Sequence, residues 1–240
     1  MKVIAPDYYS QFRCIAGACR HTCCEGWEID IDEEKLPLYR TMADIAPQID
    51  ETDTPCFRLS DNERCPFLNK DNLCDLILRH GEDILCQICR DHPRFRSFWS
   101  DRTEIGLGLV CEEAGRLILS KEKPMELTVL SDDGAADALP EDEAWLLSYR
   151  DELLQNIEKT GPKARLLEYL IYRHLPDALY DGRLDARLAF IRQSFREITG
   201  AWDKTDGTIE AMAECTRAWS YDVEYDDEEL ERRITALDTE

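Results

Sequence analysis

Residues 14–24 decide how the first half of the chain is organised, and they read Cys14-Ile15-Ala16-Gly17-Ala18-Cys19-Arg20-His21-Thr22-Cys23-Cys24. The spacing is Cys-x4-Cys-x3-Cys-Cys, so four thiols fall within eleven residues. Thiolates that short loops bring close together bind Zn²⁺ or an iron–sulfur cluster. The stretch therefore predicts a metal site in the first half of the chain.

Six further cysteines follow between residues 56 and 111. Cys65 and Cys74 flank a polar turn at residues 69–72. Cys86 and Cys89 form a Cys-x2-Cys pair, whose tight turn brings both sulfurs to one side. The candidate metal ligands are Cys14, Cys19, Cys23, Cys24, Cys65, Cys74, Cys86, Cys89 and Cys111.

These nine candidates exceed the needs of one site, because a tetrahedral zinc or a [4Fe-4S] cluster takes four ligands. The surplus implies either two sites or some thiols that are buried or act as redox partners. Cys215, isolated in a predicted helix, and Cys56 are interpreted as small buried hydrophobic residues.

Disulfide bonds are the alternative role for so many cysteines. Here the cysteine count is odd, Cys23 and Cys24 are adjacent, and residues 1–7 lack the basic and apolar regions of a secretory signal. No stretch approaches eighteen uncharged apolar residues, so no membrane-spanning helix is expected. The sequence predicts metal binding in a soluble protein of the reducing cytoplasm.

The chain is strongly acidic, with 29 basic and 51 acidic residues and a formal net charge of −22. No nucleic acid partner is expected, since no excess of Lys or Arg is available to displace counterions from phosphates. Such a surface favours a basic protein or a lysine-bearing surface as partner. An acidity that only keeps the chain soluble is the alternative.

Composition divides the chain into a cysteine-rich metal or iron–sulfur domain at 1–130, an acidic linker at 131–143 and a helical domain at 144–240. The linker is predicted because acidic residues, Gly134 and Pro140 crowd a segment of little apolar content. Beyond it, apolar residues recur at helical spacing. We predict a mainly α fold with small β elements, of the α+β class.

The expected strands cover residues 27–32, 57–59 and 125–130. The expected helices cover residues 73–80, 112–120, 145–158, 162–172, 184–198, 208–221 and 226–237. Gly81 and Gly200 are expected to end two of these helices. Residues 106–108, Gly-Leu-Gly, lack the third glycine and the βαβ context of a dinucleotide loop, so they are predicted to be extended.

Five segments carry a resemblance to a known family: Phe12-Arg13-Cys14-Ile15-Ala16-Gly17-Ala18-Cys19-Arg20-His21-Thr22-Cys23-Cys24-Glu25-Gly26-Trp27, Cys65-Pro66-Phe67-Leu68, Leu85-Cys86-Gln87-Ile88-Cys89-Arg90, Ala5-Pro6-Asp7-Tyr8-Tyr9 and Leu109-Val110-Cys111-Glu112-Glu113-Ala114. Over about half of its length the chain resembles the flagellin lysine-N-methylase family. That family belongs to a broader zinc- or iron-chelating group named for a Cys-x2-Cys-x2-Cys-Cys motif.

The resemblance implies a cytoplasmic enzyme that carries a [4Fe-4S] cluster and transfers methyl groups from S-adenosylmethionine to lysine ε-amines of flagellin or another lysine-rich protein. Zinc is the alternative metal. From the residues alone, a non-enzymatic zinc or iron–sulfur binding or redox module is the alternative function, and electron transfer is a third.

A locally basic stretch at residues 79–102 contains the Cys86 and Cys89 pair. Four thiolates around zinc or a [4Fe-4S] core leave negative charge, which nearby guanidinium groups would offset. Arg90 and Arg94 are the candidates for binding the carboxylate of the methyl donor. An ordinary segment of surface salt bridges is the alternative.

Neither the radical S-adenosylmethionine signature nor a Rossmann glycine loop is present, so the donor site would be unconventional. Tyr8, Tyr9 and Trp27 are candidates for an aromatic lysine channel, with packing against the metal loops as the alternative. His21 and His92 are expected near the metal loops but not as principal ligands. The catalytic residue stays unassigned, with Asp91 and Tyr9 as guesses for the base.

Overall fold

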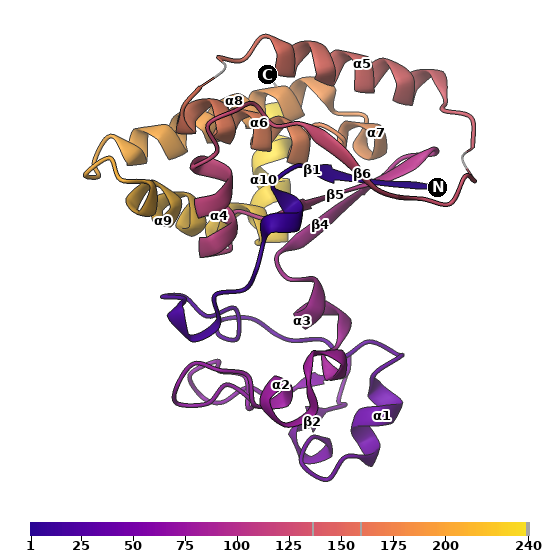
Figure 1. Ribbon diagram of the computed structural model, residues 1–240, viewed down its shortest axis with the longest axis vertical. Coiled ribbons are helices and arrows are strands. Elements are labelled where there is room, and N and C mark those ends of the chain that lie inside the picture. Colours follow the sequence, from indigo (N-terminus) through magenta and orange to yellow (C-terminus); the bar gives the residue numbers. More distant parts are fainter. Residues whose placement is uncertain (136, 159, 239–240) are drawn as a thin grey trace. The chain divides into compact units, whose positions relative to one another are not determined.

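The computed structural model describes residues 1–135, 137–158 and 160–238. Two compact units make up the chain (Figure 1). Met1–Arg13 and Pro93–Glu240 form one, which we call the sheet unit, and Cys14–His92 form the other, the cysteine unit. The cysteine unit is therefore an insertion within the sequence of the sheet unit. Both units combine helices with β elements, which confirms the predicted α+β class.

This division differs from the one predicted at 1–130, 131–143 and 144–240. The start of the chain and residues 94–132 supply the strands against which the helical half packs, so they belong with that half. The predicted acidic linker contains the end of β6 (Leu127–Asp132) and the start of α5 (Glu141–Gln155). Ala136, within that linker, lies outside the described residues.

A four-stranded sheet forms the base of the sheet unit, with strand order β4-β5-β1-β6. β4 (Arg94–Phe98) and β5 (Arg102–Leu107) form an antiparallel hairpin. β1 (Lys2–Pro6) lies parallel to β5, and β6 pairs antiparallel with β1. β6 confirms the strand predicted at 125–130, and β5 confirms that residues 106 and 107 are extended.

Helices cover most of the remaining sheet unit, as the apolar spacing predicted. They are α4 (Glu112–Leu119), α5 (Glu141–Gln155), α6 (Pro162–His174), α7 (Ala178–Asp181), α8 (Leu184–Trp202), α9 (Ile209–Trp219) and α10 (Asp227–Asp238). A π-helical turn, Ser220–Glu224, joins α9 to α10. Among the described residues, no helix combines the length and apolar character needed to cross a membrane.

The predicted end of α8 at Gly200 is wrong. The helix continues to Trp202, whose side chain is buried and donates a hydrogen bond from Nε1 to the Met212 carbonyl oxygen at 3.0 Å. Burying this large aromatic ring stabilises the last turn by more than a helical glycine costs, which is about 1 kcal/mol.

Two buried contacts hold α5 and α6 against β5. The Arg150 guanidinium of α5 binds the Glu104 carboxylate of β5 at 2.5 and 2.8 Å, and both side chains are almost fully buried. On α6, the Tyr172 hydroxyl donates to the Ile105 carbonyl oxygen at 3.1 Å. A charged pair thus lies within an otherwise apolar layer.

Close packing explains the two glycines at 106 and 108. A Cβ atom on Gly106 would overlap the ring of Phe95, and one on Gly108 would overlap the hydroxyl of Tyr225. These glycines therefore allow side chains to approach the backbone closely, and they do not form a phosphate-binding turn.

A second buried polar network surrounds Glu224, the last residue of the π-helical turn. Its carboxylate contacts His174 Nε2 at 2.7 Å and accepts hydrogen bonds from the hydroxyls of Tyr169 at 3.0 Å and Ser220 at 2.5 Å. The Tyr169 hydroxyl also accepts the Leu109 backbone N–H at 3.3 Å. The network therefore links the π-helical turn to α6 and to the segment that follows β5.

The cysteine unit consists of short elements separated by loops. They are α1 (Leu36–Thr41), β2 (Ile49–Asp50), β3 (Cys56–Phe57), α2 (Asp75–His80) and α3 (Gln87–Asp91), with 3₁₀ turns at Ala16–Ala18, Ala46–Gln48 and Glu82–Ile84. A further 3₁₀ turn, Tyr9–Gln11, lies in the sheet unit. Gly81, with φ of +84°, ends α2 as predicted. Phe57 packs between Tyr39 and Phe67 in the core of the unit.

The strand predicted at residues 27–32 is wrong as a regular strand. Its alternating burial is present, because Ile29 and Ile31 are buried, but pairing is limited to a single bridge between Asp30 and Cys56. β3 is only two residues long, so there is no longer strand on that side for the segment to pair with.

Candidate functional site

Backbone pairing places Cys24 beside Cys65. The Cys65 N–H donates to the Cys24 carbonyl oxygen at 2.8 Å, and the Gly26 N–H donates to the Glu63 carbonyl oxygen at 3.1 Å. Glu63 adopts a positive φ of 56° and Gly26 one of 86°. The first cysteine loop is thereby joined to a segment about forty residues further along the chain.

A polar turn brings Cys74 back to Cys65, as the spacing predicted. The Asn69 side chain holds this turn, because its Oδ1 accepts the N–H groups of Asp71 at 2.9 Å and Leu73 at 3.1 Å. An isolated bridge then pairs Leu68 with Cys74.

The third pair, Cys86 and Cys89, lies at the start of α3. Asp32 fixes this start, because its carboxylate accepts the Gln87 N–H at 2.6 Å. The buried Tyr39 hydroxyl donates to the Ile84 carbonyl oxygen at 2.6 Å and holds the preceding turn. Sequence reasoning missed both roles, since neither residue lies near the cysteines in the sequence.

These five cysteines converge on one core. Cys65 and Cys86 are part of the buried cluster of the cysteine unit, and Cys24, Cys74 and Cys89 pack against it. Their sulfurs are close enough to affect one another electrostatically. We call Cys24, Cys65, Cys74, Cys86 and Cys89 the thiol cluster.

Burial and mutual repulsion oppose ionisation of most of the thiol cluster. Burial, together with the negative charge that Cys24, Cys74 and Cys86 would carry, raises the pKa of Cys65 to about 12. Burial likewise raises the pKa of Cys74. Several thiolates in such a core require a cation to compensate them, and metal binding supplies one while displacing protons.

Backbone N–H groups offset part of this cost. The N–H groups of Ile77 and Leu76, at the start of α2, lower the pKa of Cys74, and the N–H of Phe67 does the same for Cys65. Hydrogen bonds from backbone N–H groups favour the charged form of a sulfur. The donor set, with its backbone partners, fits a soft metal centre.

Hydrogen bonds lower the pKa of two cysteines. The hydrogen bond from Cys23 is the main reason that the pKa of Cys24 falls to about 7 despite burial. Similarly, the hydrogen bond between Cys86 and Cys89 lowers the pKa of Cys86 and raises that of Cys89.

In the metal-free protein, alkylation of Cys24 by iodoacetamide is expected to rise with pH through about 7, whereas Cys65 reacts only under far more alkaline conditions. Short pulses between about pH 6 and 9, followed by peptide mass spectrometry, measure both rates. The Cys23→Ala variant should move the Cys24 midpoint up toward about 8.5. Identical pH profiles for Cys24 and Cys65 would contradict this assignment.

The other predicted ligands lie outside the buried cluster, although Cys23 forms a hydrogen bond with Cys24. Cys14 and Cys23 are exposed and Cys19 is half-buried in the first loop of the cysteine unit. Cys14 Sγ accepts the Ala16 N–H at 3.4 Å, and Cys19 Sγ donates to the His21 carbonyl oxygen at 2.7 Å.

Cys111 belongs to the sheet unit, where it caps the start of α4. Within the ranges that the structure describes, no three His, Cys, Asp or Glu side chains have the spacing of a formed metal site. The full set of nine ligands stays a prediction.

The two arginines proposed for the donor fall in different units. Arg90 lies in α3 of the cysteine unit, whereas Arg94 begins β4 of the sheet unit. The Arg94 Nε donates to the Tyr9 hydroxyl at 2.9 Å, and its guanidinium lies 5.4 Å from the centre of the Phe12 ring. The described contacts of Arg94 are thus with aromatic residues of its own unit.

The aromatic residues predicted to form a lysine channel are also divided. Tyr8 is buried in the core of the sheet unit, and burial raises its pKa far above the usual range. Trp27 belongs to the cysteine unit, where its Nε1 donates to the Cys23 carbonyl oxygen at 2.8 Å. Its ring meets the edge of His92 at 5.3 Å between centroids.

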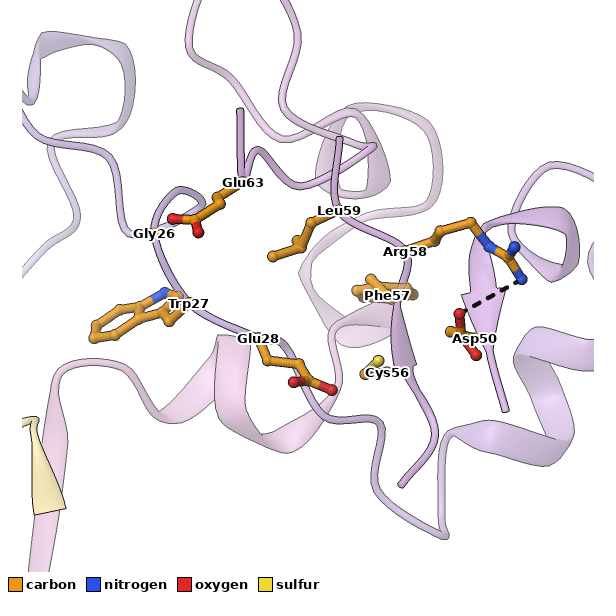
Figure 2. Close-up of a pocket in the computed structure, with 9 residues that line it drawn as sticks. All are labelled: Gly26, Trp27, Glu28, Asp50, Cys56, Phe57, Arg58, Leu59 and Glu63. Atoms are coloured by element: carbon orange, nitrogen blue, oxygen red, sulfur yellow. Dashed lines mark ion pairs between the residues drawn. The ribbon is translucent and has the colours of Figure 1, made fainter. Parts of the chain in front are cut away.

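Trp27 lines an open hollow of about 390 Å³ in the surface of the cysteine unit (Figure 2). Its other lining residues are Gly26, Glu28, Asp50, Cys56, Phe57, Arg58, Leu59 and Glu63. Burial, followed by the hydrogen bond to Glu28, raises the pKa of Cys56 to about 11, so this thiol stays protonated at neutral pH.

Comparison with known proteins finds no matching family model and no matching solved structure. Among curated proteins, the lysine-N-methylase of Salmonella choleraesuis (strain SC-B67) is 27% identical over 138 residues, which cover 52% of this chain and 34% of that protein. Over about half of its length the chain is thus distantly similar to lysine-N-methylases. The lysine-N-methylase of Salmonella typhimurium (strain LT2) is 26% identical over the same shares.

The third relative carries a flagellar name. The flagellar biosynthetic protein FliU of Salmonella muenchen is 26% identical over 137 residues, or 52% of this chain and 81% of FliU. The match spans only about a third of the length of the two lysine-N-methylases.

Proposed function

We propose that this chain takes part in methylating lysine ε-amines of a protein, with S-adenosylmethionine as methyl donor. The observation that carries the proposal is the distant similarity, over about half of the chain, to two lysine-N-methylases and to FliU. The name of FliU supports flagellin, or another lysine-rich flagellar protein, as the substrate. A net charge of −22 suits a lysine-bearing partner.

The thiol cluster is our proposed holder of a metal centre, for which a [4Fe-4S] cluster is the first candidate and zinc the alternative. Four of its five sulfurs would suffice for either. Bound there, the metal would compensate the thiolate charge and fix the loops that carry the cysteines. Cys14, Cys19 and Cys23 remain candidates for a second site, and Cys111, in the other unit, remains a separate prediction.

Methyl transfer makes a specific demand on the protein. The lysine nitrogen must lose a proton before it forms the new N–C bond, while the donor's S–C bond breaks. Among the predicted bases, Asp91 lies in α3 and Tyr9 accepts a hydrogen bond from Arg94. Arg90 and Arg94 remain proposals for the donor's carboxylate, and a cytoplasmic location remains a prediction.

The proposal predicts that anaerobically purified protein, incubated with S-adenosylmethionine and flagellin, adds mass to flagellin in steps of one methyl group. Iron, sulfide and zinc analysis of the same sample identifies the metal. Removing a residue that only hydrogen-bonds to a metal ligand lowers metal affinity about 10–100-fold. The Cys86→Ser variant removes a ligand itself, so its loss of metal affinity should be larger. Its methylation should fall accordingly.

Cys215→Ser is the matched control, since Cys215 lies in α9 of the sheet unit and should affect neither metal content nor methylation. If the metal-loaded protein leaves flagellin unmodified, the methylase proposal is contradicted and the non-enzymatic binding or redox module is favoured. Unchanged metal content in Cys86→Ser would remove the thiol cluster as the metal site.

A further inference from the structure

The hollow beside Trp27 has the chemistry of a receptor for a cation on an alkyl chain. Figure 2 shows Trp27 and Glu63 on one side of it, Glu28 below, and Leu59 and Phe57 on the side opposite Trp27. The volume of about 390 Å³ lies within the range of pockets that bind small ligands. Apolar and acidic groups therefore face the same space.

Charge in this hollow is unbalanced. Arg58 is the one basic residue in the lining, and its guanidinium points away toward Asp50, with which it forms an ion pair at 4.0 Å (Figure 2). Among the described residues, neither Glu28 nor Glu63 has a salt-bridge partner. Two carboxylates thus remain available to a ligand that brings its own positive charge.

Local contacts fix the three groups that would meet this ligand. The Cys56 thiol donates to the Glu28 carboxylate, and the hydrogen bond from Trp27 Nε1 to the Cys23 carbonyl oxygen orients the indole ring. Glu63 sits at a positive φ, held by the backbone hydrogen bond from Gly26. Little side-chain ordering is left for binding to impose on the first two groups.

We infer that this hollow receives a lysine side chain of the protein substrate, with the ε-ammonium or its methylated form between Glu28, Glu63 and Trp27. The methylene stem would lie on Leu59, and the cation would face the carboxylates and the indole ring. The identity of the ligand rests on the proposed function. The hollow would act as a docking site for the substrate, and no chemical step is assigned to it.

Binding of Nα-acetyl-lysine methylamide and of its Nε-trimethyl form to the full-length, metal-loaded protein tests this inference. The protein is labelled with 5-fluorotryptophan, and the Trp27 ¹⁹F resonance is assigned with the Trp27→Phe variant. Both probes should shift that resonance, whereas the norleucine analogue, which lacks the charge, should not. The Glu28→Gln/Glu63→Gln variant should raise the Kd about tenfold, which corresponds to about 1.4 kcal/mol.

Glu33→Gln is the matched control, because Glu33 is an exposed carboxylate of the same unit that does not line the hollow. An equal shift with norleucine, or an unchanged Kd in the double variant, would overturn the inference. Charge-dependent binding without methylation of flagellin would keep the docking site and remove the methylase. If flagellin is methylated and the double variant leaves the KM for flagellin unchanged, the methylase proposal stands and the docking site is ruled out.

Discussion

Replacing Glu104 with leucine is expected to lower the free energy of unfolding of the sheet unit by about 3–5 kcal/mol. The change leaves the Arg150 guanidinium buried without its carboxylate partner, which now binds it at 2.5 and 2.8 Å. Trp99 and Tyr172 flank the guanidinium at 5.4 and 5.5 Å, so water has little access to solvate it. Urea dependence of hydrogen exchange in peptides from β4 and β5 measures the loss within this unit.

The double variant Glu104→Leu/Arg150→Met separates charge from packing. Since it removes both charges and keeps similar volumes, its stability should lie within about 1 kcal/mol of the starting protein or above it. The exposed pair of Arg232 and Glu229 is the control, and Arg232→Met should have no measurable effect. A double variant as unstable as Glu104→Leu would show that the polar contacts themselves, rather than an unpaired charge, hold α5 to the sheet.

The Glu224→Gln substitution should cost about 3 kcal/mol at neutral pH. Burial raises the pKa of Glu224, but the hydrogen bond and charge of His174, the charge of Arg173 and the hydrogen bond of Ser220 outweigh it, so the pKa lies below its usual value. A carboxylate whose pKa is lower in the folded state stabilises the fold above its unfolded pKa of about 4.3. That contribution disappears as the pH falls through the folded pKa.

The difference between the starting protein and Glu224→Gln isolates this one carboxylate from the others that titrate in acid. We expect the difference to be full above about pH 5 and to shrink progressively below about pH 4. Urea unfolding at several pH values, followed by exchange of the α6 and α9 amides, measures it. A difference that stays constant down to pH 2–3, or about that range, would show that Glu224 does not bind as an anion.

Helices were the part of the fold that could be predicted most closely from the sequence. Apolar residues at helical spacing located α5, α6 and α9, because each of them buries one face against the same core. They also located α10, which buries Ile234 in a separate cluster with Phe190 of α8. The two errors have local causes. Burial of Trp202 carries α8 past Gly200, and residues 27–32 alternate without a strand long enough to pair with.

The division into units could not be predicted. It depends on the parallel pairing of β1 with β5, in which Lys2 pairs with Arg102. The whole cysteine unit lies between these two residues in the sequence. Parallel strands that are so far apart in the sequence leave no local sequence pattern that predicts their pairing. A hairpin such as β4-β5, in contrast, has a recognisable turn between its strands. Composition therefore predicted a boundary at 131–143, whereas the contacts divide the chain after Arg13 and after His92.

For the candidate site, cysteine spacing predicted the pairs but not their assembly. Cys65 with Cys74 and Cys86 with Cys89 were recognisable because short turns join them. The joining of Cys24 to Cys65 depends on backbone pairing across about forty residues, for which the sequence has no pattern. Glu28 and Glu63 meet in the hollow for the same reason, so neither was recognisable in a chain with 51 acidic residues.

The insertion of the cysteine unit between β1 and β4 has a consequence for synthesis on the ribosome. β1 leaves the ribosome first, yet its partner β5 follows only about 100 residues later. At about 5–20 residues per second, β1 must wait about 5–20 s for that partner. The whole of Cys14–His92 emerges during this interval. The nascent chain therefore has the time to fold its cysteine loops while the first strand of the sheet is still unpaired.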